Sequence, residues 1–209
     1  MDEPPRPARE PIFNPQAFDA APVLALVTAM AIIHLWIDTR GIAEANAIYW
    51  RWSFVSARLW AGEGLPTLLT YAMLHGSWGH LAMNGVILYA LGSAVWRVTG
   101  TVRFMALFAV TSICGALAFA LIRPDEAGPL VGASGGVFGM LGAVKRLEFA
   151  MRAMRGEPVG GEVLRFLGLI VALEVAVGLA TGGVIAWQAH LGGLLAGFAL
   201  APIFVRRRR

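Results

Sequence analysis

A serine and a histidine, each flanked by glycines within an apolar stretch, are the residues best suited to do chemistry. Ser134 lies in the run Gly-Ala-Ser-Gly-Gly, and His190 lies in the run Ala-His-Leu-Gly-Gly. A serine hydroxyl is a weak nucleophile that becomes reactive when an adjacent base takes its proton. The pair therefore predicts nucleophilic catalysis by Ser134 with His190 as general base, if the fold brings the two together.

The glycines around Ser134 suit a chain that approaches a substrate closely. We expect Ser134 near the N-terminus of a helix, where the amides of the first turn have no intrahelical acceptor and can stabilise an oxyanion. Glycine and serine are also common wherever transmembrane helices pack, so Ser134 alone is more often a packing residue. Likewise, His190 alone can be a histidine that hydrogen-bonds a neighbouring helix.

Small residues recur every four positions beside both candidate residues, at Gly135, Gly139 and Ala143 and at Ala189, Gly193 and Gly197. Two such ridges let helices approach to near backbone contact. If the ridges face each other, His190 reaches Ser134.

Further polar residues stand at the start of another apolar segment. His80 and Asn84 are four residues apart, so they share one face of a helix, and both can donate hydrogen bonds to an anionic oxygen. His75 lies just before them. Three imidazoles also raise the possibility of a metal, but no carboxylate or cysteine is expected at their depth and the spacing fits no familiar zinc motif, so we expect neither metal nor other cofactor.

The elements that position these residues must lie in lipid. Hydrophobic residues make up 57% of the 209 residues and charged residues 14%. The net charge of +4 comes from short basic clusters between apolar segments, which excludes a nucleic-acid partner and is typical of topology signals. We predict an all-α polytopic membrane protein with six spans: Ala20–Ile37, Trp78–Val98, Phe104–Ile122, Val131–Val144, Leu164–Ala180 and Val184–Val205.

Lys and Arg cluster on one side of these spans, which predicts both termini in the cytoplasm. Residues 1–19 are interpreted as a disordered cytoplasmic tail, 20–205 as a six-helix membrane domain and 206–209 as a basic cytoplasmic tail. Compact size favours a bacterial inner membrane. Within the long first loop, Leu65–Leu74 is expected to form a helix in the interface or against the bundle.

Three motifs taken together resemble the rhomboid intramembrane proteases: His-x4-His-x3-Asn from His75 to Asn84, Gly-x-Ser-Gly from Gly132 to Gly135, and Ala-His-x2-Gly-x3-Gly from Ala189 to Gly197. They fall on the second, fourth and sixth spans, as in that family.

The resemblance implies a six-helix bundle and a serine endopeptidase that cleaves transmembrane segments of protein substrates in the bilayer. It makes Ser134 the nucleophile and His190 its base, a dyad with no third acidic member. His80, Asn84 and the Ser134 amide then form the oxyanion hole. His75 supports the site near the substrate entrance, and Phe138 stacks on His190.

One departure from the family concerns the first loop. Many members carry a Trp-Arg pair before the first motif histidine, where this chain has Pro66 and Thr67. The difference affects loop structure and substrate choice, and it points to a divergent, rhombosortase-like subgroup.

Two ionisable residues in the spans have no role in the motifs. Glu174 lies in the middle of the fifth segment, where a carboxyl group is costly, and is interpreted as a hydrogen-bonded tie to a neighbouring helix. His34 is expected to reach the interface from the first span. The alternatives left open are an inactive rhomboid-like protein that binds transmembrane helices and, since polar residues in spans also mark ion paths, a small transporter or channel.

Overall fold

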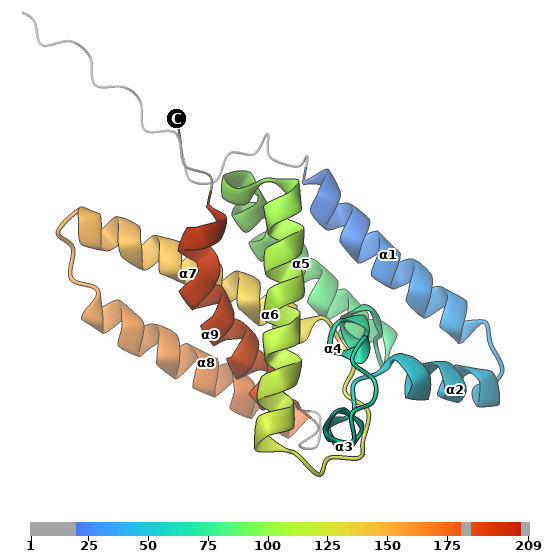
Figure 1. The fold of residues 1–209 in the computed structure, drawn as a ribbon. Coiled ribbons are helices and arrows are strands. Elements are labelled where there is room, and N and C mark those ends of the chain that lie inside the picture. Colours follow the sequence, from blue (N-terminus) through green and yellow to red (C-terminus); the bar gives the residue numbers. More distant parts are fainter. Residues whose placement is uncertain (1–19, 181–184, 206–209) are drawn as a thin grey trace, which may run out of the picture.

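The computed structural model describes residues 20–180 and 185–205, and within them the chain is helical (Figure 1). The predicted all-α class is confirmed. The elements in chain order are α1 (Ala21–Asp38), α2 (Ile42–Trp52), α3 (Ser56–Trp60), α4 (Thr67–Thr70), the 3₁₀ turn η2 (Tyr71–Met73), α5 (Trp78–Thr99), α6 (Thr101–Ile122), α7 (Ser134–Met154), α8 (Gly160–Ala180) and α9 (Trp187–Phe204). The predicted terminal tails and Val184 lie outside the described residues.

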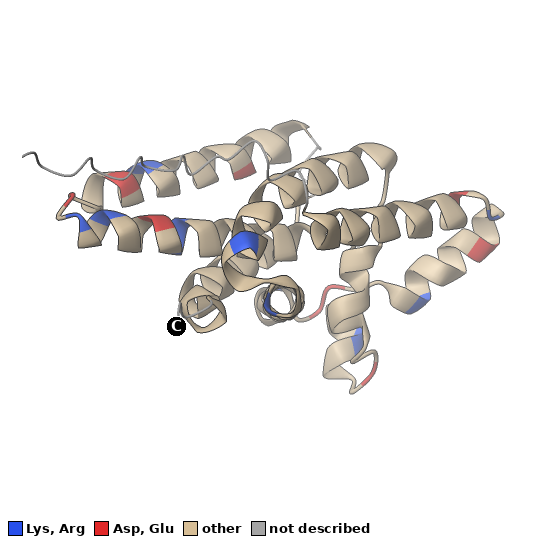
Figure 2. Cartoon of the chain, turned by 90° about the horizontal axis from the view of Figure 1, so that it is seen from above, with Lys and Arg blue, Asp and Glu red and all other residues tan. Residues whose placement is uncertain are grey.

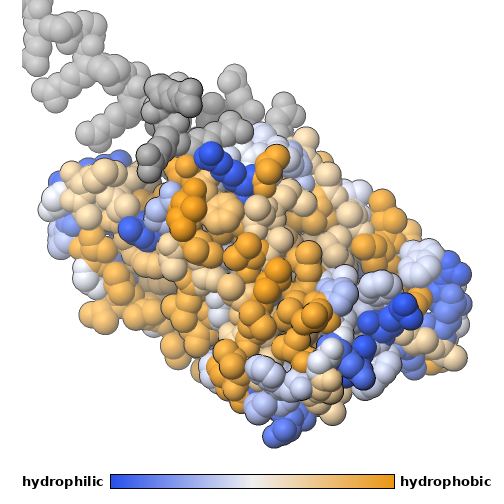
Figure 3. All heavy atoms as spheres, viewed as in Figure 1, coloured by the Kyte–Doolittle hydropathy of each residue, from blue (hydrophilic) through white to orange (hydrophobic). Residues whose placement is uncertain are grey.

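Five helices in the described part of the chain are long and apolar enough to cross a membrane, namely α1, α5, α6, α8 and α9. Hydrophobic side chains cover much of the face seen in Figure 3, and charged residues lie mostly towards the helix ends in Figure 2. Such an apolar exterior suits lipid rather than water. The chain is therefore a multi-pass membrane protein.

Helix α7 differs from the span predicted for it. The helix begins at Ser134 instead of Val131 and continues well past Val144, to Met154. Its second half is charged, and Glu148 pairs with Lys145 at 2.6 Å and with Arg152 at 3.3 Å. Charge ends the apolar stretch at Val144, but these pairs at three- and four-residue spacing favour helix, so the helix continues beyond it. The same charges keep α7 out of the set of apolar spans, and the sixth crossing stays a prediction.

The centre of the molecule is the contact between α7 and α9, and the two small-residue ridges do face each other there. A Cβ atom added to Gly193 would lie 1.9 Å from the carbonyl oxygen of Gly135, and one added to Gly197 would lie 1.9 Å from that of Gly139. The helices thus approach to backbone contact, as the four-residue spacing predicts. Helix α6 packs on the same pair, with Gly115 beside the carbonyl oxygen of Ala189.

The first loop is more helical than its sequence indicates. It forms α2 and α3, and within the stretch Leu65–Leu74 the short elements α4 and η2 follow each other directly, which fits the expected alternative of a helix against the bundle. These turns pack against the bundle: Thr67, Tyr71 and Ala72 are buried. Phe54 and Leu130 exchange backbone hydrogen bonds of 3.1 and 2.8 Å, which tie this loop to the segment leading to Ser134.

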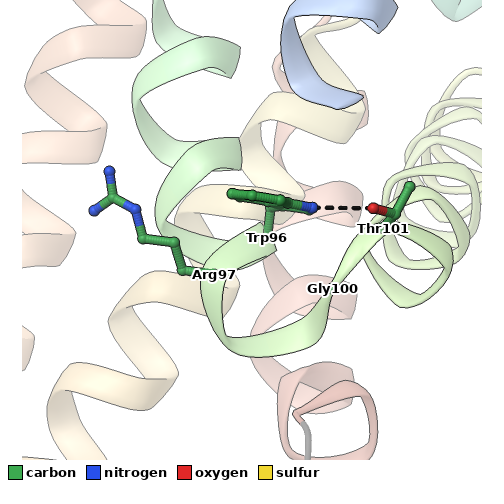
Figure 4. A pocket seen from close by; sticks show the side chains of 4 residues that line it. All are labelled: Trp96, Arg97, Gly100 and Thr101. Atoms are coloured by element: carbon green, nitrogen blue, oxygen red, sulfur yellow. Dashed lines mark hydrogen bonds between the residues drawn. The ribbon is translucent and has the colours of Figure 1, made fainter. Parts of the chain in front are cut away.

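The corner between α5 and α6 also differs from prediction, because α6 begins at Thr101 rather than Phe104. Gly100 has φ +76, a left-handed conformation that suits glycine and lets the two helices follow each other directly. The indole nitrogen of Trp96 donates a 3.2 Å hydrogen bond to Oγ1 of Thr101 across the corner, while the Arg97 side chain points away from it (Figure 4). The residues of this turn also line a small pocket at the corner (Figure 4).

Candidate active site

Ser134 occupies the first position of α7, directly after a tight turn. Gly132 has φ +117, and Ala133 is the N-cap residue. The turn is tied to η2, because the amide of Gly132 donates a 3.0 Å hydrogen bond to the carbonyl oxygen of Tyr71. The first-turn amides of α7, that of Ser134 included, have no acceptor within the helix, so they can donate to a group bound beside the helix start.

His190 lies in the first turns of α9 with its ring against Ser134. Its Nε2 atom is 2.9 Å from Oγ of Ser134. The ring of Phe138, one turn after Ser134, stacks on the imidazole at 4.3 Å between centroids with an interplanar angle of 2°. This geometry matches what the resemblance implies, and it allows Nε2 to accept the serine proton.

The other face of the turn is lined by His80 and Asn84 of α5. A Cβ atom on Gly132 would lie 2.7 Å from Nε2 of His80 and 3.6 Å from Nδ2 of Asn84, so both nitrogens approach the residue two positions before Ser134. Asn84 is buried, and its Nδ2 has no hydrogen-bond partner among the described residues. Ser77 caps α5 by accepting a 3.2 Å hydrogen bond from the His80 amide, which fixes the first turn of that helix.

His75 is brought close to His80 but lies in the interior, not at an exposed entrance. Its side chain is fully buried, and its ring meets that of His80 edge-on at 5.2 Å. Burial, together with the nearby His80 and His34 rings, lowers the pKa of His75 to about 3. His75 is therefore neutral at physiological pH, and its ring packs against that of His80.

This burial predicts acid-sensitive stability. The unfolded chain gains a proton on His75 below its ordinary pKa of about 6.5 while the folded chain does not, so stability present above 6.5 is lost as the pH falls toward 3. We expect wild-type protein in detergent to lose about 1 kcal/mol more stability per pH unit in this window than His75→Gln does. Thermal unfolding between pH 7 and 5 measures it, and parallel losses in both proteins would contradict the assignment.

Glu174 is hydrogen-bonded to a neighbouring helix, as the sequence interpretation has it, but its partner is one that the sequence did not indicate. Its Oε1 atom lies 2.7 Å from Nδ1 of His190, on the ring edge opposite Ser134. The expectation that no carboxylate lies at the depth of the histidines is therefore wrong, and an acidic side chain stands beside the imidazole where the resemblance implies none. Glu174 comes from the middle of α8, and nothing in the apolar sequence around it indicates which neighbour it faces.

A cavity of about 450 Å³ opens beside this acid, between α7, α8 and α9. Phe138, Glu174 and His190 are among the residues that line it, and the others are aliphatic residues and Trp187. The site thus adjoins an apolar space that lies within the membrane-spanning part of the fold.

Tyr71 is a second residue that sequence reasoning missed. It is almost fully buried, its hydroxyl donates a 2.8 Å hydrogen bond to the carbonyl oxygen of Ser112, and that hydroxyl also borders Gly135. It joins α6, the turn before Ser134 and the start of α7. In the described part of the chain, no three His, Cys, Asp or Glu side chains gather as a metal site.

The fold and site define a class: a polytopic helical membrane protein with a serine and a histidine in contact inside its bundle. Residues 60–207 match the Rhomboid domain, which is most of the chain, and the chain therefore belongs to the rhomboid family. The expected resemblance is confirmed.

Several individual proteins are similar to the chain. It is 34% identical over 134 residues to the rhomboid protease GluP of Bacillus subtilis (strain 168), a match covering 64% of this chain and 25% of GluP. It is 27% identical over 188 residues, 90% of each protein, to YdcA of the same strain, which is provisionally named a rhomboid protease. It is 33% identical over 138 residues to the mitochondrial rhomboid protein 1 of Saccharomyces cerevisiae (strain ATCC 204508 / S288c), covering 63% of this chain and 39% of that protein. The chain thus spans about a quarter of GluP but nine tenths of YdcA.

Proposed function

We propose that this chain is an intramembrane serine endopeptidase in which Ser134 is the nucleophile and His190 the general base. The observation that carries the proposal is the 2.9 Å contact between Oγ of Ser134 and Nε2 of His190, inside a helical bundle of the rhomboid family. A base within hydrogen-bond reach is what a serine nucleophile requires.

The reaction follows from this contact. Oγ of Ser134 attacks the carbonyl carbon of a substrate peptide bond while its proton passes to Nε2 of His190. The tetrahedral oxyanion collapses, the C–N bond breaks, and the proton passes from Nε2 to the leaving amine. Water then attacks the acyl-enzyme by the same route, which yields a carboxylic acid and restores Ser134.

The oxyanion is stabilised by donors around Gly132 in this proposal. The amide of Ser134 approaches from α7, and the side chains of His80 and Asn84 approach from α5. Hydrogen bonds aimed at a developing charge act mainly in the transition state, so they raise kcat rather than ground-state affinity.

Asn84→Ala is therefore expected to lower kcat by about 10²-fold and to change KM little, since one oxyanion donor is worth roughly this much. Steady-state cleavage of a fluorescent transmembrane substrate in liposomes gives both constants. Met83→Ala, an exposed neighbour on the same helix, serves as control. A kcat for Asn84→Ala within about twofold of wild type would remove Asn84 from the oxyanion hole.

Substrates in this proposal are transmembrane segments of other proteins, reached through the bilayer. The apolar cavity between α7, α8 and α9 supports this, because its aliphatic walls suit hydrophobic side chains and His190 is part of its lining. We also place the protein in a bacterial inner membrane with both termini in the cytoplasm, since Lys and Arg cluster on one side of the spans. The six-helix domain 20–205 with polar ends is part of this proposal.

The test uses purified protein in liposomes, a panel of fluorescent transmembrane peptides and a serine-directed fluorophosphonate. We expect cleavage of at least one peptide by wild type, no cleavage by His190→Ala, and covalent labelling that maps to Ser134. If wild type neither cleaves any peptide nor is labelled at Ser134, the proposal fails. The result would then favour the alternative that the chain is a rhomboid-like protein that binds transmembrane helices without cutting them.

A further inference from the structure

The imidazole of His190 has a partner at both ring nitrogens. Nε2 meets Oγ of Ser134 at 2.9 Å, and Nδ1 meets Oε1 of Glu174 at 2.7 Å. The three groups come from three helices, α7, α9 and α8, and the ring lies between the two oxygens. A neutral imidazole carries one proton, so the group at Nδ1 decides which nitrogen is free to act as base.

Stacking on Phe138 does not make this choice. The planes of the two rings are nearly parallel, with an angle of 2° between them, so Phe138 fixes the plane of the imidazole. A half turn of the ring about its bond to Cβ leaves that plane unchanged but exchanges the positions of the nitrogens and carbons. Stacking is also indifferent to the position of the proton. A hydrogen bond at Nδ1 selects both the ring orientation and the tautomer.

Glu174 sits where a carboxyl group is expensive, in the apolar middle of α8. Among the described residues, its only ion-pair partner within 4.0 Å is His190, and its second oxygen is buried without a hydrogen-bond partner. The side chains of His190 and Glu174 are only 12% and 18% exposed. The carboxyl group is thus directed at the imidazole and at little else.

We propose that Glu174 is a positioning residue of the active site, the third member of a Ser134–His190–Glu174 relay. The inference rests on the proposed function of Ser134 and His190. The Glu174 carboxylate accepts the Nδ1–H of His190 and so leaves Nε2 with a lone pair directed at the serine hydroxyl. It also stabilises the imidazolium formed during attack, by placing a negative charge 2.7 Å from Nδ1.

No proton reaches Glu174 in this scheme. The proton of Ser134 moves to Nε2 as the Oγ–C bond forms, then from Nε2 to the leaving nitrogen as the C–N bond breaks. The imidazolium between these steps has protons on both nitrogens, and the carboxylate beside it keeps its negative charge. The carboxylate therefore acts through His190 and never touches the substrate.

A simpler role for Glu174 is to hold α8 against α9, since none of the residues 160–180 of α8 is buried. The two roles differ in what Glu174→Gln does. Glutamine keeps the size and can still hydrogen-bond Nδ1, so the tie between the helices persists. It has no negative charge, and its amide can accept from one tautomer or donate to the other. Only a positioning role predicts a chemical defect in this variant.

We expect Glu174→Gln to lower kcat about 10²-fold with KM unchanged, and Glu174→Asp to recover part of the loss because it keeps the charge. Loss of the carboxylate in soluble serine-protease triads costs roughly 10⁴-fold, and Phe138 already holds the ring plane here. Glu162→Gln on the same helix, whose carboxylate pairs with Arg165 at 3.0 Å, is the matched control with unchanged rates. Wild-type kcat in Glu174→Gln would overturn the proposal.

A spectroscopic measurement tests the same point in the wild-type protein. The chain has four histidines, so ¹⁵N-histidine spectra compared with His190→Ala identify the His190 signals. We expect a protonated Nδ1 and an unprotonated Nε2, and a smaller share of this tautomer in Glu174→Gln. A proton on Nε2 with Nδ1 free in wild type would mean that Glu174 donates instead of accepting, and would end the proposal even if the Glu174 variants fail to fold.

The same experiments separate this inference from the proposed function. If wild type cleaves and labels at Ser134 while Glu174→Gln matches it in kcat and tautomer, only the role of Glu174 is lost. If wild type neither cleaves nor labels, the function of Ser134 fails, and the role of Glu174 falls with it.

Discussion

Replacement of Ser134 by alanine is expected to lower the rate of peptide cleavage by at least about 10⁴-fold, and addition of His190→Ala to Ser134→Ala is expected to cost almost nothing more. The reason is that the two side chains perform one step: Nε2 of His190 is useful only as acceptor of the proton on Oγ of Ser134, 2.9 Å away. Residues that act as a unit show such grossly non-additive losses.

Single-turnover cleavage in liposomes by wild type, both single variants and the double variant measures this. Ser134 is at the helix start and its loss leaves no buried charge, so circular dichroism and thermal unfolding of Ser134→Ala should match wild type. Additive losses in activation free energy, in which the double variant is slower than wild type by the product of the two single effects, would show that the two residues act separately and contradict the proposed reaction.

The contact between Ser134 and His190 is the part of the site that sequence best predicts. Spacings of four residues place Gly135, Gly139 and Ala143 on one face of a helix, and the same holds for Ala189, Gly193 and Gly197. Helix faces made of small residues can pack on each other in lipid, because only small side chains let two helix backbones approach so closely. Their mutual contact then fixes where the serine and the histidine lie.

The same reasoning does not place Glu174 or His34, although small residues recur every four positions in their helices too, at Gly168, Ala172 and Ala176 and at Ala21, Ala25 and Ala29. Helix α8 is apolar around its whole circumference, so its pattern does not reveal which side faces α9, and only the structure shows Glu174 at Nδ1 of His190. His34 was expected at the interface, but it is 5% exposed and packs edge-on against Trp78 at 4.7 Å. A residue's position near the end of a span therefore does not reveal whether its side chain reaches the interface or is buried against neighbouring residues.

The structure of the first loop also could not be predicted from the sequence. Helices α2, α3 and α4 depend on contacts with distant residues, such as the 3.2 Å hydrogen bond from the indole of Trp60 to the carbonyl oxygen of Ala120 and the 2.8 Å bond from Thr70 to that of Trp52. Tertiary contacts of this kind override the weak propensity of short segments. Burial of His75 follows from the same folding of the loop.

Gly193→Ala is the change expected to damage the fold most for a single methyl group. The new Cβ would lie 1.9 Å from the carbonyl oxygen of Gly135, which belongs to the backbone of α7 and cannot rotate away. Helices α7 and α9 must therefore separate, and the resulting loss of packing is expected to exceed about 3 kcal/mol, at the upper end of overpacking costs. Since Ser134 and His190 stand at the same interface, their hydrogen bond is lost as well.

Gly168→Ala provides a matched control for this change. Gly168 is also within a membrane-spanning helix, but a Cβ atom there meets nothing within 4 Å, so alanine should be neutral or slightly stabilising. Yield from membranes, thermal unfolding in detergent and fluorophosphonate labelling of Ser134 measure the comparison. The expected order is a large drop in all three for Gly193→Ala and none for Gly168→Ala. Equal behaviour of the two variants would mean that α7 and α9 do not meet at backbone distance, and the position of His190 against Ser134 would then lose its physical basis.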